Sequence, residues 1–131
     1  MLIDSNIIIY AAQLERSDLR HLIATHAPFV SAVSYVEVLG YHQLSDAERQ
    51  HFTAFFESAT VLAITTPVLE QSVKLRQLKK MTLGDALIAA TCLVHSLTLI
   101  TRNKKDFDWI PNLPVIDPFT ETIDNLENQS E

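Results

Sequence analysis

Acidic residues stand at the ends of apolar segments in this chain, where α/β proteins place the groups that do chemistry. Asp4 follows the apolar start of the chain, Glu37 and Asp85 each lie inside an apolar stretch, and Asp106 comes soon after the apolar segment 97–101. Because desolvating a lone carboxylate costs several kcal/mol unless it is paired or bound to a cation, we expect these acids to converge. Converging, they would form a site for Mg²⁺ or Mn²⁺, able to activate water and to stabilise the oxygens of a phosphodiester during hydrolysis.

Two of these acids also have a purely structural interpretation. Glu37 lies three residues after Ser34, and Asp85 lies three residues after Thr82, which is the spacing of a capping box. In the first turn of a helix, each carboxylate would favour the helix dipole by about 0.3–1 kcal/mol. Asp4 differs from both, because an acid at the end of a strand is less often structural, and the joint pattern favours a functional site.

The composition is that of one domain in a reducing compartment. A chain of 131 residues buries enough surface to fold without disulfides, and Cys92 has no second cysteine to pair with. We interpret Cys92 as a core thiol. Neither a signal-peptide pattern nor an apolar run of about 18 residues is present, so we expect a cytoplasmic protein that does not insert into a membrane.

The charge is unevenly distributed along the chain. The net charge is −6, yet residues 74–105 carry seven basic side chains against one acid, which gives +6, and the rest carries −12. The basic segment is interpreted either as a solvated helix face or as a rim that steers phosphates beside the acidic site.

Strands alternate with helices in the predicted order. Strands are expected over 1–3, 28–31, 60–64, 97–101 and 114–116, and helices over 5–13, 17–25, 34–40, 46–58, 66–80 and 82–97, with Ser5, Ser34 and Thr66 as N-caps of three of them. This alternation predicts an α/β fold, a three-layer α/β/α sandwich with a mostly parallel central sheet. One domain covers residues 1–119, and the acidic tail 120–131 is expected to fray after Ile123.

Four segments, in order, resemble the motifs of PIN-domain ribonucleases, and most closely those of the VapC-type toxins of bacterial toxin-antitoxin pairs. Residues 2–6 look like the first acidic motif, and residues 31–38 are similar to the strand-to-helix segment that carries the family's Glu. Residues 84–91 resemble the third motif and residues 99–107 the fourth. The match spans about residues 1–119, so the predicted sandwich would be PIN-like.

The resemblance implies a Mg²⁺- or Mn²⁺-dependent endoribonuclease without an organic cofactor. Asp4 and Asp85 would hold the ion, with Glu37 bound directly or through water. The implied catalytic set is completed by Asn103 or Asp106, the supporting residues are Ser5, Asn6 and Thr101, and the basic residues placed to bind RNA are Arg102, Lys104 and Lys105.

One position departs from the family pattern. Many members carry an Asp two residues after the Thr of the fourth motif, where this chain has Asn103. An amide oxygen can ligate a hard cation or orient its water, but it brings no charge and cannot act as a base. We therefore expect one ion and doubt a second, and whether Asn103 or Asp106 completes the site stays open.

The resemblance also implies a homodimer and a cognate antitoxin whose tail blocks the site, with an inserted Arg or Lys satisfying the carboxylates. Aromatic side chains that are candidates for dimer contacts, or for plain core packing, are Tyr35, Tyr41, Phe52, Phe55 and Phe56. Trp109 is interpreted as an anchor for its loop, with stacking on a nucleobase as the alternative. The five histidines lack the spacing of metal ligands and are interpreted as surface or satisfied residues.

Three other functions are compatible with parts of the pattern. A catalytically silent PIN-like module would only bind RNA or protein, but it would have no reason to gather Asp4, Glu37 and Asp85. A PIN nuclease of RNA maturation would share the chemistry without an antitoxin. A phosphoacceptor protein fits less well, because Asn6 stands where a phosphatase of that type would carry its second Asp.

Overall fold

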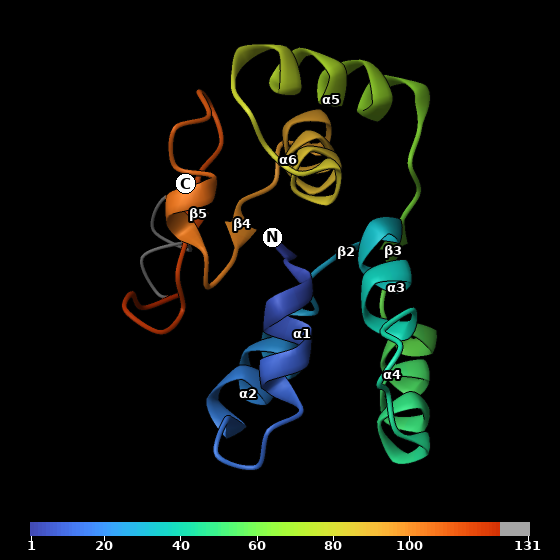
Figure 1. Cartoon of the computed structure of the whole chain (residues 1–131). Helices are drawn as coiled ribbons and strands as arrows, with labels where there is room; N and C mark the ends of the chain where they lie inside the picture. The colour runs from blue at the N-terminus through green and yellow to red at the C-terminus, as the bar shows by residue number, and fades with distance from the viewer. Residues whose placement is uncertain (124–131) are drawn as a thin grey trace.

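The computed structural model describes residues 1–123, and in them strands alternate with helices as predicted (Figure 1). The strands are β1 (Leu2–Ile3), β2 (Val30–Ser31), β3 (Val61–Leu62), β4 (Leu99–Ile100) and β5 (Val115–Ile116). The helices are α1 (Ser5–Ala11), α2 (Ser17–His26), α3 (Ala32–Leu39), α4 (Asp46–Ser58), α5 (Thr66–Leu78) and α6 (Leu83–His95), with a short 3₁₀ turn, η1 (Lys104–Asp106). None of the helices in this part of the chain has the length and apolar character needed to cross a bilayer.

The strands pair in parallel throughout the described residues. β1 pairs with β4, β4 pairs with β5, and β2 pairs with β3. A parallel bridge between Leu2 and Phe29 joins the two groups, and the Ile3 amide donates to the Phe29 carbonyl at 3.0 Å. The spatial order is therefore β3-β2-β1-β4-β5. Because the chain leaves β1 toward one side and returns to β4 on the other, β1 and β4 flank the topological switch point, where open α/β sheets bind ligands.

The sheet separates two hydrophobic clusters, because successive side chains of a strand point to opposite faces. On one face, Leu2, Leu99 and Val115 pack in the same cluster as residues of α5 and α6, whereas on the other, Ile3, Ile100 and Ile116 pack with residues of α1, α2 and α4. Figure 1 shows α5 and α6 together on one side of the strands, with α1 and α2 on the opposite side. The predicted three-layer α/β/α sandwich is confirmed.

Helix α6 contributes more buried residues than any other described helix. Ala86, Ala89 and Ala90 have no exposed surface, and Cys92 is equally buried. Burial raises the pKa of the Cys92 thiol to about 12, because the thiolate would lose its hydration. The interpretation of Cys92 as a core thiol is confirmed.

Two predicted N-caps are displaced by one residue. The cap of α1 is Asp4 rather than Ser5, and the Asp4 carboxylate accepts a hydrogen bond from the Ser5 amide. The cap of α5 is Thr65 rather than Thr66, which places Pro67 in the first turn. In both cases the cap is the last residue with extended backbone angles, and two adjacent polar residues cannot be told apart by type alone.

The predicted capping box of Ser34 and Glu37 is wrong. Helix α3 begins three residues earlier than expected, because Ser31 at the end of β2 caps it and accepts a hydrogen bond from the Val33 amide at 3.1 Å. Ser34 is consequently buried inside the helix, and Glu37 falls in its last turn instead of its first. The shift removes the structural role that a capping box would have given Glu37.

The segment after β5 folds back onto the body of the domain. Asp117 is buried and accepts a hydrogen bond from Arg102 at 2.8 Å. The Phe119 ring lies against two guanidinium groups, 3.7 Å from Arg16 and 4.6 Å from Arg102. Ile123 packs at the edge of the cluster formed by α1, α2 and α4. The predicted fraying of the tail concerns residues 124–131, which lie outside the described residues.

Candidate active site

Asp4 lies at the carboxyl end of β1, at the switch point of the sheet, and only 5% of its surface is exposed. Both of its carboxylate oxygens accept hydrogen bonds. Oδ1 accepts from the Ser5 amide at 2.7 Å, while Oδ2 accepts from the Thr101 hydroxyl at 2.8 Å and from the Asn6 side-chain amide at 3.2 Å. Thr101 follows β4, so the two strands that flank the switch point meet at this carboxylate. The three residues expected to support Asp4 all contact it.

The pKa of Asp4 is raised from 3.8 to about 6. The main cause is burial, because the ionised carboxylate loses hydration that the protein only partly replaces. Hydrogen bonds from Thr101 and Ser5 stabilise the ionised form and limit the rise, whereas the negative charges of Asp85 and Glu37 add to it. Asp4 therefore stands in a field of like charge, which a bound cation would relieve.

Glu37 reaches this site from the last turn of α3. The Ser5 hydroxyl lies 2.8 Å from Glu37 Oε1, to which it donates, and 2.8 Å from the Ser34 hydroxyl. The other oxygen, Oε2, lies beside Gly84 at the start of α6, where a Cβ atom would come within 2.8 Å of it. Gly84 thus leaves space for the Glu37 carboxylate next to Asp85.

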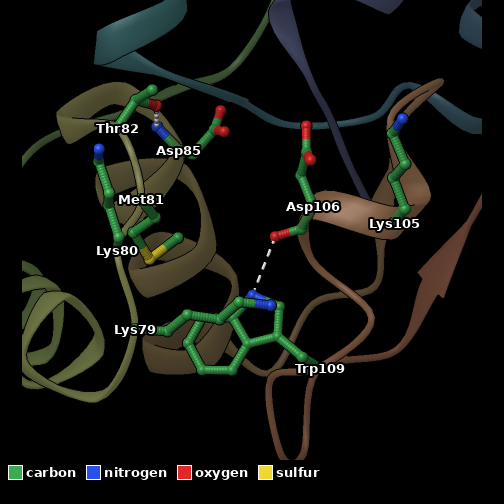
Figure 2. Close-up of a pocket in the computed structure, with 8 residues that line it drawn as sticks. All are labelled: Lys79, Lys80, Met81, Thr82, Asp85, Lys105, Asp106 and Trp109. Atoms are coloured by element: carbon green, nitrogen blue, oxygen red, sulfur yellow. Dashed lines mark hydrogen bonds between the residues drawn. The ribbon is translucent and has the colours of Figure 1, made fainter.

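Asp85 and Asp106 complete the acidic group. Asp85 lies in the first turn of α6, where its amide donates to the Thr82 hydroxyl at 3.2 Å, and Asp106 ends η1. The pKa of Asp85 is raised, first by burial and then by the charges of Asp106 and Glu37, against the stabilising bond from Thr82. Figure 2 shows the Asp85 and Asp106 carboxylates at the same end of a pocket, approaching from α6 and η1.

The donor set fits a hard divalent cation. The carboxylates of Asp4, Glu37 and Asp85 are oxygen ligands of the kind that Mg²⁺ and Mn²⁺ prefer, and the charge of Glu37 adds to the rise in pKa of both aspartates. Across residues 1–123, no three His, Cys, Asp or Glu side chains lie together so that they could hold a metal ion by themselves. Mg²⁺ usually keeps several waters and is bound by one or two carboxylates plus substrate phosphate, so it does not require such a group.

Asn103 and Asp106 occupy different surroundings. The backbone amide of Asn103 donates to the Thr101 hydroxyl at 3.1 Å, so this residue helps to orient the group that binds Asp4. Asp106 instead contributes charge, since it raises the pKa of Asp85. Both side chains are exposed.

Two of the three basic residues expected to bind RNA are paired within the chain. Arg102 binds Asp117, and Lys104 Nζ lies 2.7 Å from Glu121 Oε1. Lys105 is exposed and lines the pocket that holds Asp85 and Asp106. Sequence reasoning did not find the partners of Arg102 and Lys104, because Asp117 lies 15 residues beyond Arg102 in the chain and Glu121 belongs to the segment that was expected to be a tail.

Sequence reasoning also missed the roles of Ser34 and Gly84. Ser34 was interpreted as a helix cap, whereas it is buried against Ser5 beneath Glu37. Gly84 is one of only two glycines in the chain and directly precedes Asp85. A glycine inside a predicted helix is a signal of close packing, so this contact could have been expected from the sequence.

The five aromatic residues divide between the two interpretations, core packing and contact with a partner. Phe52 and Phe56 are buried in the cluster of α4, and Phe55 is half-buried beside them. Tyr35 and Tyr41 are about half exposed, so they stay candidates for contacts with a partner.

The family model for the PIN domain matches residues 1–112, and the chain belongs to the PIN-domain family. PIN domains are generally nucleases. The match includes every acidic residue of the group described above.

Chains of several solved structures are similar to this fold. A chain of a toxin-antitoxin complex from Klebsiella pneumoniae is 30% identical, with a TM-score of 0.72 over 89% of this chain and 96% of that one. VapBC2 from Rickettsia felis, bound to a promoter DNA fragment, is 19% identical, with a TM-score of 0.77 over 88% and 96%. FitAcB from Neisseria gonorrhoeae is 21% identical, with a TM-score of 0.72 over 92% and 99%. A search of curated proteins finds no significant match. The predicted resemblance to VapC-type PIN domains is confirmed.

The raised pKa of Asp4 predicts how stability depends on pH in EDTA. Between about pH 4 and pH 6 the folded chain keeps a proton on Asp4 that the unfolded chain has released. The free energy of unfolding should therefore fall as the pH rises through this window, by up to about 3 kcal/mol. Urea unfolding of the wild type and of Asp4→Asn at a series of pH values measures the effect. The variant should lose most of this fall and be the more stable protein at pH 8, and identical pH profiles would contradict the assignment.

Proposed function

We propose that this chain is a Mg²⁺- or Mn²⁺-dependent endoribonuclease and acts as the toxin of a toxin-antitoxin pair. The observation that carries the proposal is the buried Asp4 carboxylate at the switch point of the sheet, with its pKa raised to about 6 beside Asp85 and Glu37. Perturbed carboxylates gathered at such a place are typical of a catalytic site. The family membership, and a 30% identical relative from a toxin-antitoxin complex, support the same function.

In this proposal Asp4 and Asp85 hold one ion, and Glu37 contributes directly or through a water molecule. When bound, the ion supplies Lewis-acid stabilisation of the phosphodiester and makes a water molecule acidic enough to be deprotonated near neutral pH. Thr101, Asn6 and Ser5 fix the orientation of Asp4 through their hydrogen bonds. The Ser5 hydroxyl also fixes Glu37 Oε1 and leaves Oε2 on the side of Gly84.

Asp106 is the better candidate for the fourth member of the site. Its charge raises the pKa of Asp85, and both residues line the same pocket. Asn103 acts through its backbone amide on Thr101 and so supports the orientation of Asp4. We propose a single ion, because Asn103 brings no charge at the position where many family members carry an Asp.

The antitoxin and the homodimer are proposed from the family resemblance and from the relatives. Exposed apolar side chains near the site form a surface that a partner would bury. Tyr35 is 49% exposed, Val36 69% and Tyr41 52%. A basic side chain from an antitoxin would satisfy the same carboxylates that otherwise hold the ion, which explains how one protein could block the other.

The proposal is tested by incubating total RNA with the purified chain and Mg²⁺ or Mn²⁺. We expect discrete fragments with the wild type, and intact RNA with EDTA, with Asp4→Asn and with Asp85→Asn. Both variants should fold, because removing one of several like charges relieves repulsion. Fragments that persist in folded Asp4→Asn would contradict the metal site, and intact RNA with a wild type that binds the ion would favour a silent binding module.

A paired substitution identifies the fourth member of the site. Asp106→Ala should lower kcat by about 10- to 100-fold, since it removes a carboxylate that helps to hold the ion or its water, whereas Asn103→Ala should retain most activity because its backbone amide remains. Single-turnover cleavage of one identified RNA target measures both. Full activity in both variants would make the site one of three acids.

Gly84→Ala tests whether the close approach of Glu37 to α6 matters. The added Cβ would displace the Glu37 carboxylate, so kcat should fall about 10- to 100-fold, while the helix should become equally stable or up to about 1 kcal/mol more stable. The matched control is the same change in a Glu37→Ala background, where the carboxylate is absent and Gly84→Ala should have no further effect on cleavage. An equal loss in both backgrounds would show that Gly84 acts independently of Glu37.

A further inference from the structure

A pocket of about 440 Å³ has Asp85 and Asp106 of the acidic group in its lining (Figure 2). Its size lies within the range of about 300–1,000 Å³ that is usual for sites of small ligands. Two structural segments form it, the approach to α6 and the turn that contains η1. The residues that line it are Lys79, Lys80, Met81, Thr82, Asp85, Lys105, Asp106 and Trp109.

Trp109 provides an aromatic face in this pocket. Its indole nitrogen donates to the backbone carbonyl of Asp106 at 3.0 Å, so the ring is held in a fixed relation to the acidic group. The ring is only partly buried, and the ammonium of Lys79 lies 5.3 Å from its centroid. The ring packs in part against the hydrophobic cluster of α5 and α6, and its exposed part, where the Lys79 side chain lies, can take another stacking partner.

Basic side chains surround the same space. Lys80 comes from the segment before α6, and Lys105 comes from η1, on the opposite side of the pocket (Figure 2). Both are exposed. Unlike Arg102 and Lys104, which are paired with acids of the segment after β5, these two lysines line the pocket itself. The pocket thus combines acidic groups at one end with cations and an aromatic ring nearby.

We propose that this pocket receives one nucleotide of a single-stranded RNA, next to the bond that is cut. The base stacks on Trp109 in place of the Lys79 ammonium, and Lys80 and Lys105 bind the adjacent phosphates. The inference rests on the proposed nuclease function and extends it, since it assigns a base subsite and a preference for strands whose bases are unpaired.

The chemistry of the pocket explains why the subsite should accept any base and why it should prefer single strands. Stacking on an aromatic ring accepts any base, because every base has a π face, so the subsite should be tolerant of sequence. A base inside a duplex is already stacked and paired, and would have to be extruded at a cost of a few kcal/mol. The pocket therefore selects single strands by the availability of a base.

Trp109 is the only tryptophan of the chain, so its fluorescence reports on this pocket alone. We would titrate the full chain in EDTA, which prevents cleavage, with hexauridylate, with an abasic ribose-phosphate strand of the same length, and with a blunt RNA duplex. Hexauridylate should quench the fluorescence, while the abasic strand and the duplex should leave it nearly unchanged. Equal quenching by the abasic strand would show a simple anion site and would overturn the proposal.

Substitutions test the same assignment by the anisotropy of labelled hexauridylate. Trp109→Leu should weaken binding about 5- to 150-fold, the loss usual for a base-stacking aromatic, and Trp109→Tyr should restore most of it. Lys80→Gln and Lys105→Gln should each reduce the slope of log K against log salt by about 0.7, whereas Lys74→Gln, on α5 and outside the lining of the pocket, should not. Wild-type affinity in folded Trp109→Leu would overturn the proposal.

The failure of this inference and that of the nuclease proposal are distinguishable. Metal-dependent cleavage without quenching, and with a normal rate in Trp109→Leu, would overturn the nucleotide pocket and leave the nuclease in place. Base-dependent quenching by a protein that never cleaves RNA would support the pocket and overturn the nuclease.

Discussion

The burial of one carboxylate is the constraint on which the rest of this structure depends. Asp4 ends β1 where the sheet reverses its winding, and the ionised group is deprived of water at that position. Three hydrogen bonds compensate it only in part, because its pKa still rises to about 6. Thr101 contributes one of them from the end of β4, 97 residues away in the chain, so the pairing of the two central strands and the orientation of Asp4 require each other.

The basic side chains that are near in the chain do not neutralise the acidic group. Arg102 and Lys104 lie in the same motif as Asp106 and are close enough in the chain to neutralise the site, yet Asp117 and Glu121 bind them instead. A basic side chain that satisfied Asp4 or Asp85 internally would remove the need for a cation. The segment after β5 therefore holds two cations in ion pairs of its own, so that they do not neutralise the acidic group.

Helix α3 shows how a shift in one element changes the interpretation of a residue. With its cap at Ser34, Glu37 would be a first-turn acid with a structural role. With its cap at Ser31, Glu37 lies in the last turn, held by Ser5 and facing Gly84. The same carboxylate is then unfavourable to the helix dipole, which makes a functional reason for its presence stronger.

The amino-acid sequence by itself determined the order of strands and helices, the parallel sandwich and the acids that gather at its edge. These follow from local rules, namely hydrophobic periodicity, polar helix caps and the presence of an acidic residue directly after an apolar strand. It did not separate Asp4 from Ser5 or Ser31 from Ser34 as caps, because polar residues close together in the chain have similar preferences and only backbone angles decide between them. Tertiary structure alone decided which basic side chains form ion pairs, which oxygen of Glu37 accepts a hydrogen bond and which residues adjoin Trp109. Each of these depends on contacts between residues far apart in the chain.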